Sequence, residues 1–123
     1  MRFINSVLLC GQVSSSDSIR SFSTTRGRIL CFDLMTKKHG GTGGFEYHHV
    51  VARDGSGGDL ATRSLRIVTP GREIRVSGRL SYRLRMGTGL GEVRVTEIDA
   101  LSICPVMMID ENSAEEHNAQ RFS

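Results

Sequence analysis

The sequence has little of what stabilises disulfide-rich, zinc-binding and membrane-spanning proteins. It holds three cysteines among 123 residues, and Cys10, Cys31 and Cys104 lie far apart in separate apolar segments. An odd number of cysteines without close pairs argues against a disulfide framework and against a zinc site. We therefore expect buried, reduced thiols and a reducing compartment. No apolar run approaches the length that spans a bilayer, so we expect no membrane contact.

The sequence also lacks a recognisable catalytic arrangement. No Ser–His–Asp order stands out, no carboxylate pair sits in an apolar context, and no His/Cys/Asp set has metal-ligand spacing. Asp33, between Cys31 and Met35, is expected to form hydrogen bonds rather than to transfer protons. The glycine-rich segments 40–44 and 55–58 lack the frames that cradle phosphates and are interpreted as flexible connections. We expect no enzymatic activity, small-molecule substrate, metal or cofactor.

Charge divides the chain into two parts. The net charge is +3, but the C-terminal segment 107–123 holds four of the 13 acidic residues and only one of the 16 basic ones. A basic body with an acidic, polar end indicates a folded domain over residues 1–106 followed by a flexible acidic tail over 107–123.

Segment 72–86 is the most informative part of the sequence. Its even positions are apolar, from Ile74 to Met86, except Gly78. Its odd positions are polar, and four of them are Arg75, Arg79, Arg83 and Arg85. Because alternate side chains of a strand point to opposite faces, we expect a core face on one side and a row of guanidinium groups on the other. Such a row suits a polyanion such as a nucleic acid, and a merely solubilising outer face is the alternative.

The remaining pattern predicts five strands and one helix. Strands are expected over 3–13, 28–36, 45–53, 72–86 and 92–103, and the stretch 14–27 is expected to be a polar connection. The helix is expected over 60–68, with Asp59 as its cap and Thr69-Pro70-Gly71 as its end. This order predicts an all-β, five-stranded OB-fold barrel with one short helix between strands three and four, a fold that binds oligonucleotides.

Four motifs in order resemble the bacterial-type single-stranded DNA-binding proteins, which have the OB fold. They are Asn5-Ser6-Val7-Leu8-Leu9-Cys10-Gly11-Gln12-Val13 in the first strand, Glu46-Tyr47-His48-His49-Val50-Val51 in the third, the helical segment 60–71, and Val76-Ser77-Gly78-Arg79-Leu80 in the fourth. The resemblance runs through residues 3–103. Asn5-Ser6-Val7 and the His48-His49 pair are also similar to a divergent branch, the OB-fold interaction proteins of the trypanosome mitochondrial RNA-editing complex.

The resemblance implies a binding surface that departs from the family pattern. The family stacks bases on exposed aromatic side chains, yet this chain has no Trp and two Tyr. Tyr47 stands where the family has a stacking Trp. The other stacking positions fall near His39, at Arg85 and at the Asp54-Gly55 turn. We therefore expect salt-sensitive binding dominated by charge, with little selectivity between bases.

Two functional hypotheses follow. In the first, the chain binds single-stranded RNA or DNA through a groove of basic and aromatic side chains: Tyr47, Arg28, Arg75, Arg79, Arg83 and Arg85, with Lys37, Lys38 and Arg94 at its margin. In the second, it is an interaction module. The family positions imply a protein interface at Asn5, Val7, Leu9 and His48, and an exposed first-strand edge can add a strand from another chain.

We favour a combination, an OB-fold subunit of an RNA-processing assembly that associates with other OB-fold proteins and binds RNA. The editing-complex branch implies a mitochondrial location, although the sequence begins without a segment that resembles a transit peptide. The alternative is a bacterial or organellar single-stranded DNA-binding protein acting as a homo-oligomer. The paired histidines are interpreted as simple strand alternation, one inward and one outward, rather than as metal ligands.

Overall fold

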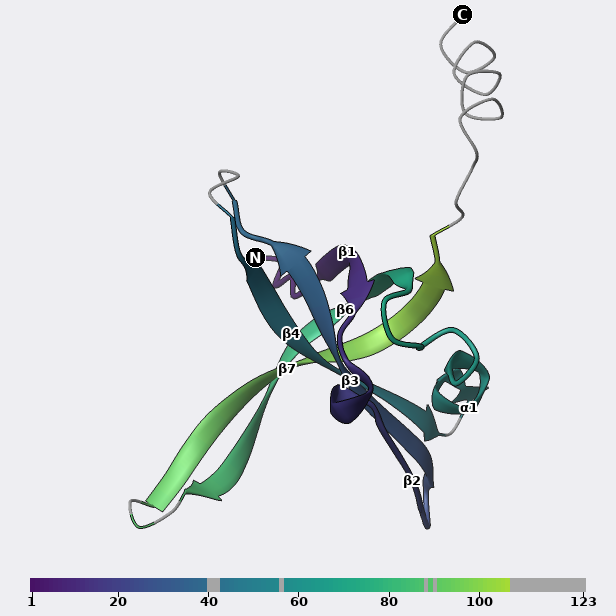
Figure 1. Cartoon of the computed structure of the whole chain (residues 1–123). Helices are drawn as coiled ribbons and strands as arrows, with labels where there is room; N and C mark the ends of the chain where they lie inside the picture. Colours follow the sequence, from purple (N-terminus) through teal and green to yellow (C-terminus); the bar gives the residue numbers. More distant parts are fainter. Residues whose placement is uncertain (40–42, 56, 88, 90, 107–123) are drawn as a thin grey trace, which may run out of the picture.

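The computed structural model describes residues 1–39, 43–55, 57–87, 89 and 91–106 (Figure 1). In chain order its elements are β1 (Val7–Val13), the 3₁₀ turn η1 (Ser16–Ser18), β2 (Arg20–Thr24), β3 (Gly27–Lys37), β4 (Phe45–Gly55), β5 (Gly58–Asp59), α1 (Leu60–Ser64), β6 (Glu73–Gly87) and β7 (Gly91–Pro105). No helix in the described residues is both long enough and apolar enough to cross a membrane.

Five of the strands close into a ring. The sheet order is β2-β3-β1-β6-β7-β4-β5, and an additional pairing of β3 with β4 joins the two sides. The pairing of β4 with β7 is parallel and short, with Val50 opposite Ile98 and Val51 opposite Asp99. The ring contains the five predicted strands, with α1 between β4 and β6, so the predicted architecture is confirmed.

The ring encloses a continuous apolar core. On β3, the predicted face of Leu30, Phe32 and Leu34 is fully buried. The other strands and the segment around α1 complete the core with Val13, Val50, Ala52, Leu60, Ala61, Val68, Ile74, Val76, Ile98, Ala100 and Ile103. At roughly 1.5–3 kcal/mol for each large aliphatic or aromatic side chain, this burial is the main force that holds the strands together.

The prediction for residues 14–27 was wrong in part. A second strand, β2, lies within this polar stretch and pairs antiparallel with β3, from Arg20 opposite Cys31 to Thr24 opposite Gly27. All of its side chains are exposed, so the ladder forms through backbone hydrogen bonds without the apolar alternation that marks a buried strand. The first strand also begins at Val7 rather than at Phe3.

The helix is shorter than predicted and is capped by a different residue. It ends at Ser64, and Leu65 is exposed rather than packed in the core. Asp59 makes no side-chain cap bond. Instead Asp54, at the end of β4, accepts a hydrogen bond from the Thr62 amide at 3.0 Å and another from the Thr62 hydroxyl. The cap therefore comes from the neighbouring strand.

The predicted core face of segment 72–86 holds only for its first half. Ile74 and Val76 are buried, but Leu84 and Met86 are 62% and 76% exposed. Beyond the ring, β6 and β7 continue as a two-stranded ribbon, which we call the arm (residues 80–87 and 91–97; Figure 1). The arm leaves the barrel, so the core does not cover its apolar side, where Arg94 lies over the Tyr82 ring.

Burial of the cysteines was also predicted wrongly. Cys10 is exposed, Cys31 and Cys104 are half-buried, and all three thiols are free. Cys10 lies on the outer side of β1, since burial alternates along this strand. The predicted acidic tail over 107–123 and part of the glycine-rich segments (residues 40–42 and 56) lie outside the described residues.

Candidate nucleic-acid interface

The outer face of β3 and β4 carries several side chains that suit a nucleic acid, among them Arg53, Tyr47 and Lys37. Register places five pairs along it: Ile29 with Arg53, Cys31 with Val51, Asp33 with His49, Met35 with Tyr47, and Lys37 with Phe45. The intervening residues, such as Leu30 and Phe32, point into the core. The period-two pattern of a closed barrel thus separates a binding face from a core face on the same two strands.

A groove of about 480 Å³ crosses the middle of this face. Its floor is made by Cys31, Asp33 and His49 of β3 and β4. One wall comes from η1 and β2, and the other comes from the arm. The wall residues are Asp17, Ser18, Arg20, Phe22, Arg83 and Arg85. Cations from β2 and from β6 therefore face one another across a sheet surface, with an exposed phenylalanine beside them.

The two histidines of β4 point to opposite sides, as predicted. His49 Nδ1 lies 3.2 Å from Asp33 Oδ1 in the groove floor. His48 Nε2 lies 2.8 Å from Thr36 Oγ1 on the other side of the strands. The His49 contact is consistent with the hydrogen-bonding role expected for Asp33. The described residues contain no cluster of three or more metal-ligating side chains.

An ion-pair network ties the arginine row of β6 to β7. Arg79 Nε lies 3.2 Å from Asp99, and Arg83 lies 3.8 Å from Glu97. Arg53 of β4 approaches the same two carboxylates, at 3.1 Å from Asp99 and 3.6 Å from Glu97. Glu97 is 4% exposed, so it depends on these arginines to offset the cost of burying its charge. The network holds three cations and two anions, which leaves a positive surface.

The environment of the groove also affects the Cys31 thiol. Burial raises the pKa of Cys31, and the nearby Glu97 carboxylate raises it further. Near the C-terminal end of β7 the direction is opposite. The hydroxyl of Ser102, 3.5 Å from the Cys104 sulfur, lowers the pKa of Cys104. Cys31 is therefore the more strongly protonated of the two thiols near neutral pH.

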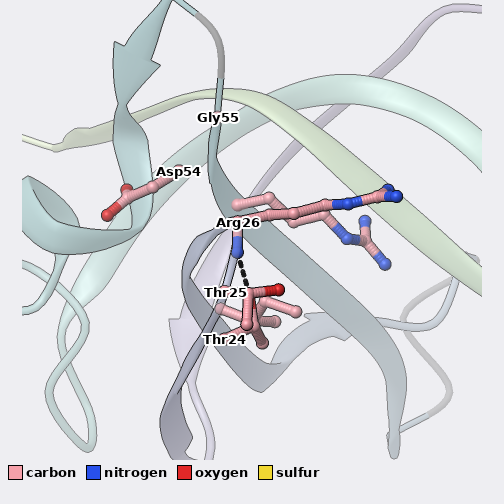
Figure 2. A pocket seen from close by; sticks show the side chains of 7 residues that line it. Thr24, Thr25, Arg26, Asp54 and Gly55 are labelled. Carbon is pink, nitrogen blue, oxygen red and sulfur yellow. Dashed lines mark hydrogen bonds between the residues drawn. The ribbon is translucent and has the colours of Figure 1, made fainter.

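A second hollow extends the outer face beyond Ile29 and Arg53. It measures about 710 Å³ and lies between the turn of the β2–β3 hairpin and the end of β4 (Figure 2). The Arg26 amide donates a hydrogen bond to the Thr24 hydroxyl at 3.1 Å, which fixes the turn. The other lining residues are Thr25, Asp54 and Gly55.

Two exposed aromatic rings occupy the other end of the face. Tyr47 is 60% exposed and Phe45 is 44% exposed, and they follow one another on the same side of β4. A hollow of about 630 Å³ adjoins Phe45, with Cys10, Met35 and Lys37 among its lining residues. Bases stack well on such rings. From Arg26 to Phe45, the face thus combines cations with aromatic surfaces.

The structure does not bring all predicted binding residues to this face. Arg28 donates to the Ser21 hydroxyl at 2.7 Å on the opposite side of β3. Arg94 lies over the Tyr82 ring, 5.2 Å from its centre, on the apolar side of the arm. Arg75 pairs in register with Cys10 and Cys104, at the opposite end of β6 from the arm. Lys38 is exposed next to the loop that joins β3 and β4.

Sequence reasoning missed Arg20, Phe22, Arg26 and Arg53. Arg20 and Phe22 stand two apart, as side chains on one face of a strand do, and that spacing was the one local sign of their role. The polar residues around them masked it.

The predicted protein-interface residues have internal contacts in the chain. The side-chain amide of Asn5 donates a hydrogen bond to the Leu80 carbonyl at 2.8 Å and accepts one from the Leu80 N–H at 2.9 Å. Val7 and Leu9 are half-buried against the core. Leu8, which points the other way, is 66% exposed. The outer surface of β1 is therefore formed by Leu8 and Cys10.

No protein-family profile and no curated protein match the sequence. Among solved structures, the chain is similar to the Plasmodium falciparum SSB in complex with ssDNA. The TM-score is 0.64 at 19% identity, and the match covers 87% of this chain and 98% of the SSB chain. This chain has an OB fold. The predicted likeness to single-stranded DNA-binding proteins is thus confirmed for the fold.

Proposed function

We propose that this OB fold binds single-stranded nucleic acid along the outer face of β3 and β4. The observation that carries the proposal is the groove in which Arg20 and Phe22 of β2 face Arg83 and Arg85 of β6. The cations on both walls can contact the phosphates of a bound strand. The exposed rings of Phe22, Phe45 and Tyr47 offer surfaces on which bases can stack. The Plasmodium SSB, of the same fold, was solved with ssDNA.

As a finer proposal, the ligand is RNA and the chain is a subunit of a mitochondrial RNA-editing assembly. Support comes from the resemblance of Asn5-Ser6-Val7 and His48-His49 to the interaction proteins of that complex. A homo-oligomeric single-stranded DNA-binding protein is the alternative. Association has a candidate surface on the outside of the barrel, since Leu8 and Leu101 are 66% and 68% exposed. Register places Ser77 of β6 between the strands that carry them.

The test is a fluorescence-anisotropy titration with labelled oligo(U) and oligo(dT) at several salt concentrations. We expect binding that weakens steeply as salt rises, because arginines release counterions from the phosphates. A preference for oligo(U) would favour the RNA-editing assembly. Absence of binding at low salt by the folded protein would overturn the proposal.

Two variants locate the site without breaking the ion-pair network. Arg85→Glu should weaken binding. It should also reduce the steepness of log K against log salt concentration by about one or more, since each phosphate contact contributes about one to this slope. Tyr47→Ala should cost about 1–3 kcal/mol of binding free energy if a base stacks there. Arg66→Glu is the matched control, because Arg66 is exposed after α1 and does not line the groove.

A further inference from the structure

The arm carries an apolar row and an open strand edge on the same residues. Leu80, Tyr82, Leu84 and Met86 share one face of β6, and Tyr82 is 57% exposed. The Asn5 amide bonds both backbone groups of Leu80, so the N–H and C=O of Leu80 point away from β7. Backbone groups alternate sides along a strand, and those of Tyr82, Leu84 and Met86 therefore point the same way.

This edge is unpaired in the described part of the chain. β1 pairs with β6 only from Glu73 to Gly78, and the Asn5 side chain extends the ladder by one step at Leu80. The side-chain amide thus makes the pair of hydrogen bonds that a backbone peptide of an added strand would make. An open edge beside an exposed apolar row is the surface that strand addition uses.

Charge on the opposite face restricts what can pair here. Arg79, Arg83 and Arg85 alternate with the apolar row. If a second copy paired antiparallel through the same edge, a two-fold axis at Arg83 or Leu84 would set Arg83 opposite the partner's Arg83 or Arg85. Like charges directly opposite one another destabilise a strand pair. Acidic residues at those positions would instead stabilise it.

We propose that the edge of β6 over Tyr82–Met86 binds an extended segment of another protein in which apolar residues alternate with acidic ones. Its apolar side chains pack beside the Leu80–Met86 row, and its carboxylates face Arg83 and Arg85. Six backbone groups, one N–H and one C=O on each of Tyr82, Leu84 and Met86, gain partners. The proposal does not rest on nucleic-acid binding, because the strand edge and the apolar row lie outside the groove, although Arg83 and Arg85 belong to both surfaces.

Amide hydrogen exchange followed by NMR tests the proposal on the full chain. The probe is a short, blocked peptide that alternates valine and glutamate, and the control peptide alternates valine and lysine. In the free protein, the amides of Tyr82, Leu84 and Met86 should exchange fast, whereas those of Arg83 and Arg85, bonded to β7, exchange slowly. The glutamate peptide should slow the three fast amides by about tenfold or more at saturation. The lysine peptide should not.

Variants separate the contribution of the apolar row from that of the arginine charges. Leu84→Ser should weaken peptide binding, and Arg85→Gln should reduce the preference for glutamate over lysine. Val93→Ser is the matched control, since Val93 is an exposed apolar residue of the arm on the arginine side.

Four outcomes would overturn the proposal. They are failure of the glutamate peptide to protect the three amides, equal protection by both peptides, protection of these amides in the free monomer, and protection that appears only as the chain self-associates. The third would mean that the chain covers its own edge, and the fourth that a second copy does.

Discussion

At the residue scale, the buried carboxylate of Glu97 depends on its arginine neighbours. It is 4% exposed, and in the described residues its ion-pair partners are Arg53 at 3.6 Å and Arg83 at 3.8 Å. Both arginines lie on the face proposed to bind nucleic acid. Their guanidinium groups therefore serve the fold and the binding surface together, which explains why reversing the charge of Arg83 would be a poor test of binding.

Glu97→Gln should separate these two roles. Removing the carboxylate releases positive charge to the groove, so oligonucleotide affinity and its salt slope should both rise. The free energy of unfolding should fall by about 1–3 kcal/mol, because a buried polar group loses charge-assisted partners. Urea unfolding and anisotropy titration measure the two effects. Affinity that falls together with stability would contradict the prediction.

The two half-buried cysteines should react differently with pH. Burial and Glu97 raise the pKa of Cys31, whereas the Ser102 hydroxyl lowers that of Cys104. Because the thiolate is the nucleophile, alkylation of Cys104 should reach its maximal rate at a lower pH than alkylation of Cys31. Peptide mapping after timed iodoacetamide treatment measures both rates. Ser102→Ala should move the Cys104 profile to higher pH, and identical profiles in the unmodified chain would contradict the prediction.

At the element scale, Gly78 allows the backbones of β6 and β7 to approach closely. The register shifts between Ser77 and Gly78, where β7 carries one extra residue. A Cβ atom at Gly78 would overlap the Asp99 carbonyl oxygen and lie 3.0 Å from the Ala100 Cα. The glycine of the Val-x-Gly-x-Leu motif is thus needed for close backbone approach at a bulge.

Gly78→Ala should lower the free energy of unfolding by about 1–3 kcal/mol or more, as overpacking does elsewhere. Gly55→Ala is the control, since a Cβ atom there meets nothing within 4 Å. It should change stability by less than about 0.5 kcal/mol. Urea midpoints of the two variants decide the matter, and equal midpoints would show that the bulge adapts to a methyl group.

The link between β4 and α1 should depend on pH. The Thr62 hydroxyl and amide lower the pKa of Asp54. A depressed folded-state pKa contributes stability above the unfolded value, and this contribution is lost as the pH falls through the folded value. Asp54→Asn should therefore be less stable than the parent at neutral pH, and the difference should shrink in acid. Urea midpoints across pH test this, and a difference independent of pH would refute it.

Sequence reasoning succeeded where burial and periodicity coincide. Leu30, Phe32 and Leu34 alternate inside the barrel, and their pattern predicted both the strand and its core face. It failed where backbone pairing acts alone, as in β2. It also failed to predict that Val76 is buried whereas Leu84 is exposed, since both belong to one period-two pattern. That pattern records which face of a strand is apolar, but the place where the barrel ends depends on residues far away in the chain.

At the scale of the whole molecule, the barrel presents two outer surfaces that adjoin at the hollow lined by Cys10 and Met35. The face of β3 and β4 carries the groove, and the face of β1 carries Leu8. The order of strands and helix predicted the ring. The groove itself was not predictable, because Arg20, Phe22, Arg83 and Arg85 meet only after β2 and the arm fold toward β3.

Leu8→Asp should abolish association through β1 without unfolding the chain. Leu8 is 66% exposed, so an aspartate there stays in water in the monomer. Val7→Asp should instead unfold the chain, because Val7 packs against the core. Sedimentation equilibrium and urea unfolding measure the two effects. A homo-oligomer that keeps its mass with Leu8→Asp would place the association surface elsewhere.

The closure of the barrel by β7 has a consequence for biosynthesis. β7 pairs with both β6 and β4, and it supplies Ile98, Ala100 and Ile103 to the core. On a ribosome, the inner faces of β3 and β4 therefore stay open to solvent until almost the whole domain has been translated. A nascent chain that stops before Ile98 lacks the closing strand, so we expect it to be held by chaperones or degraded rather than to fold.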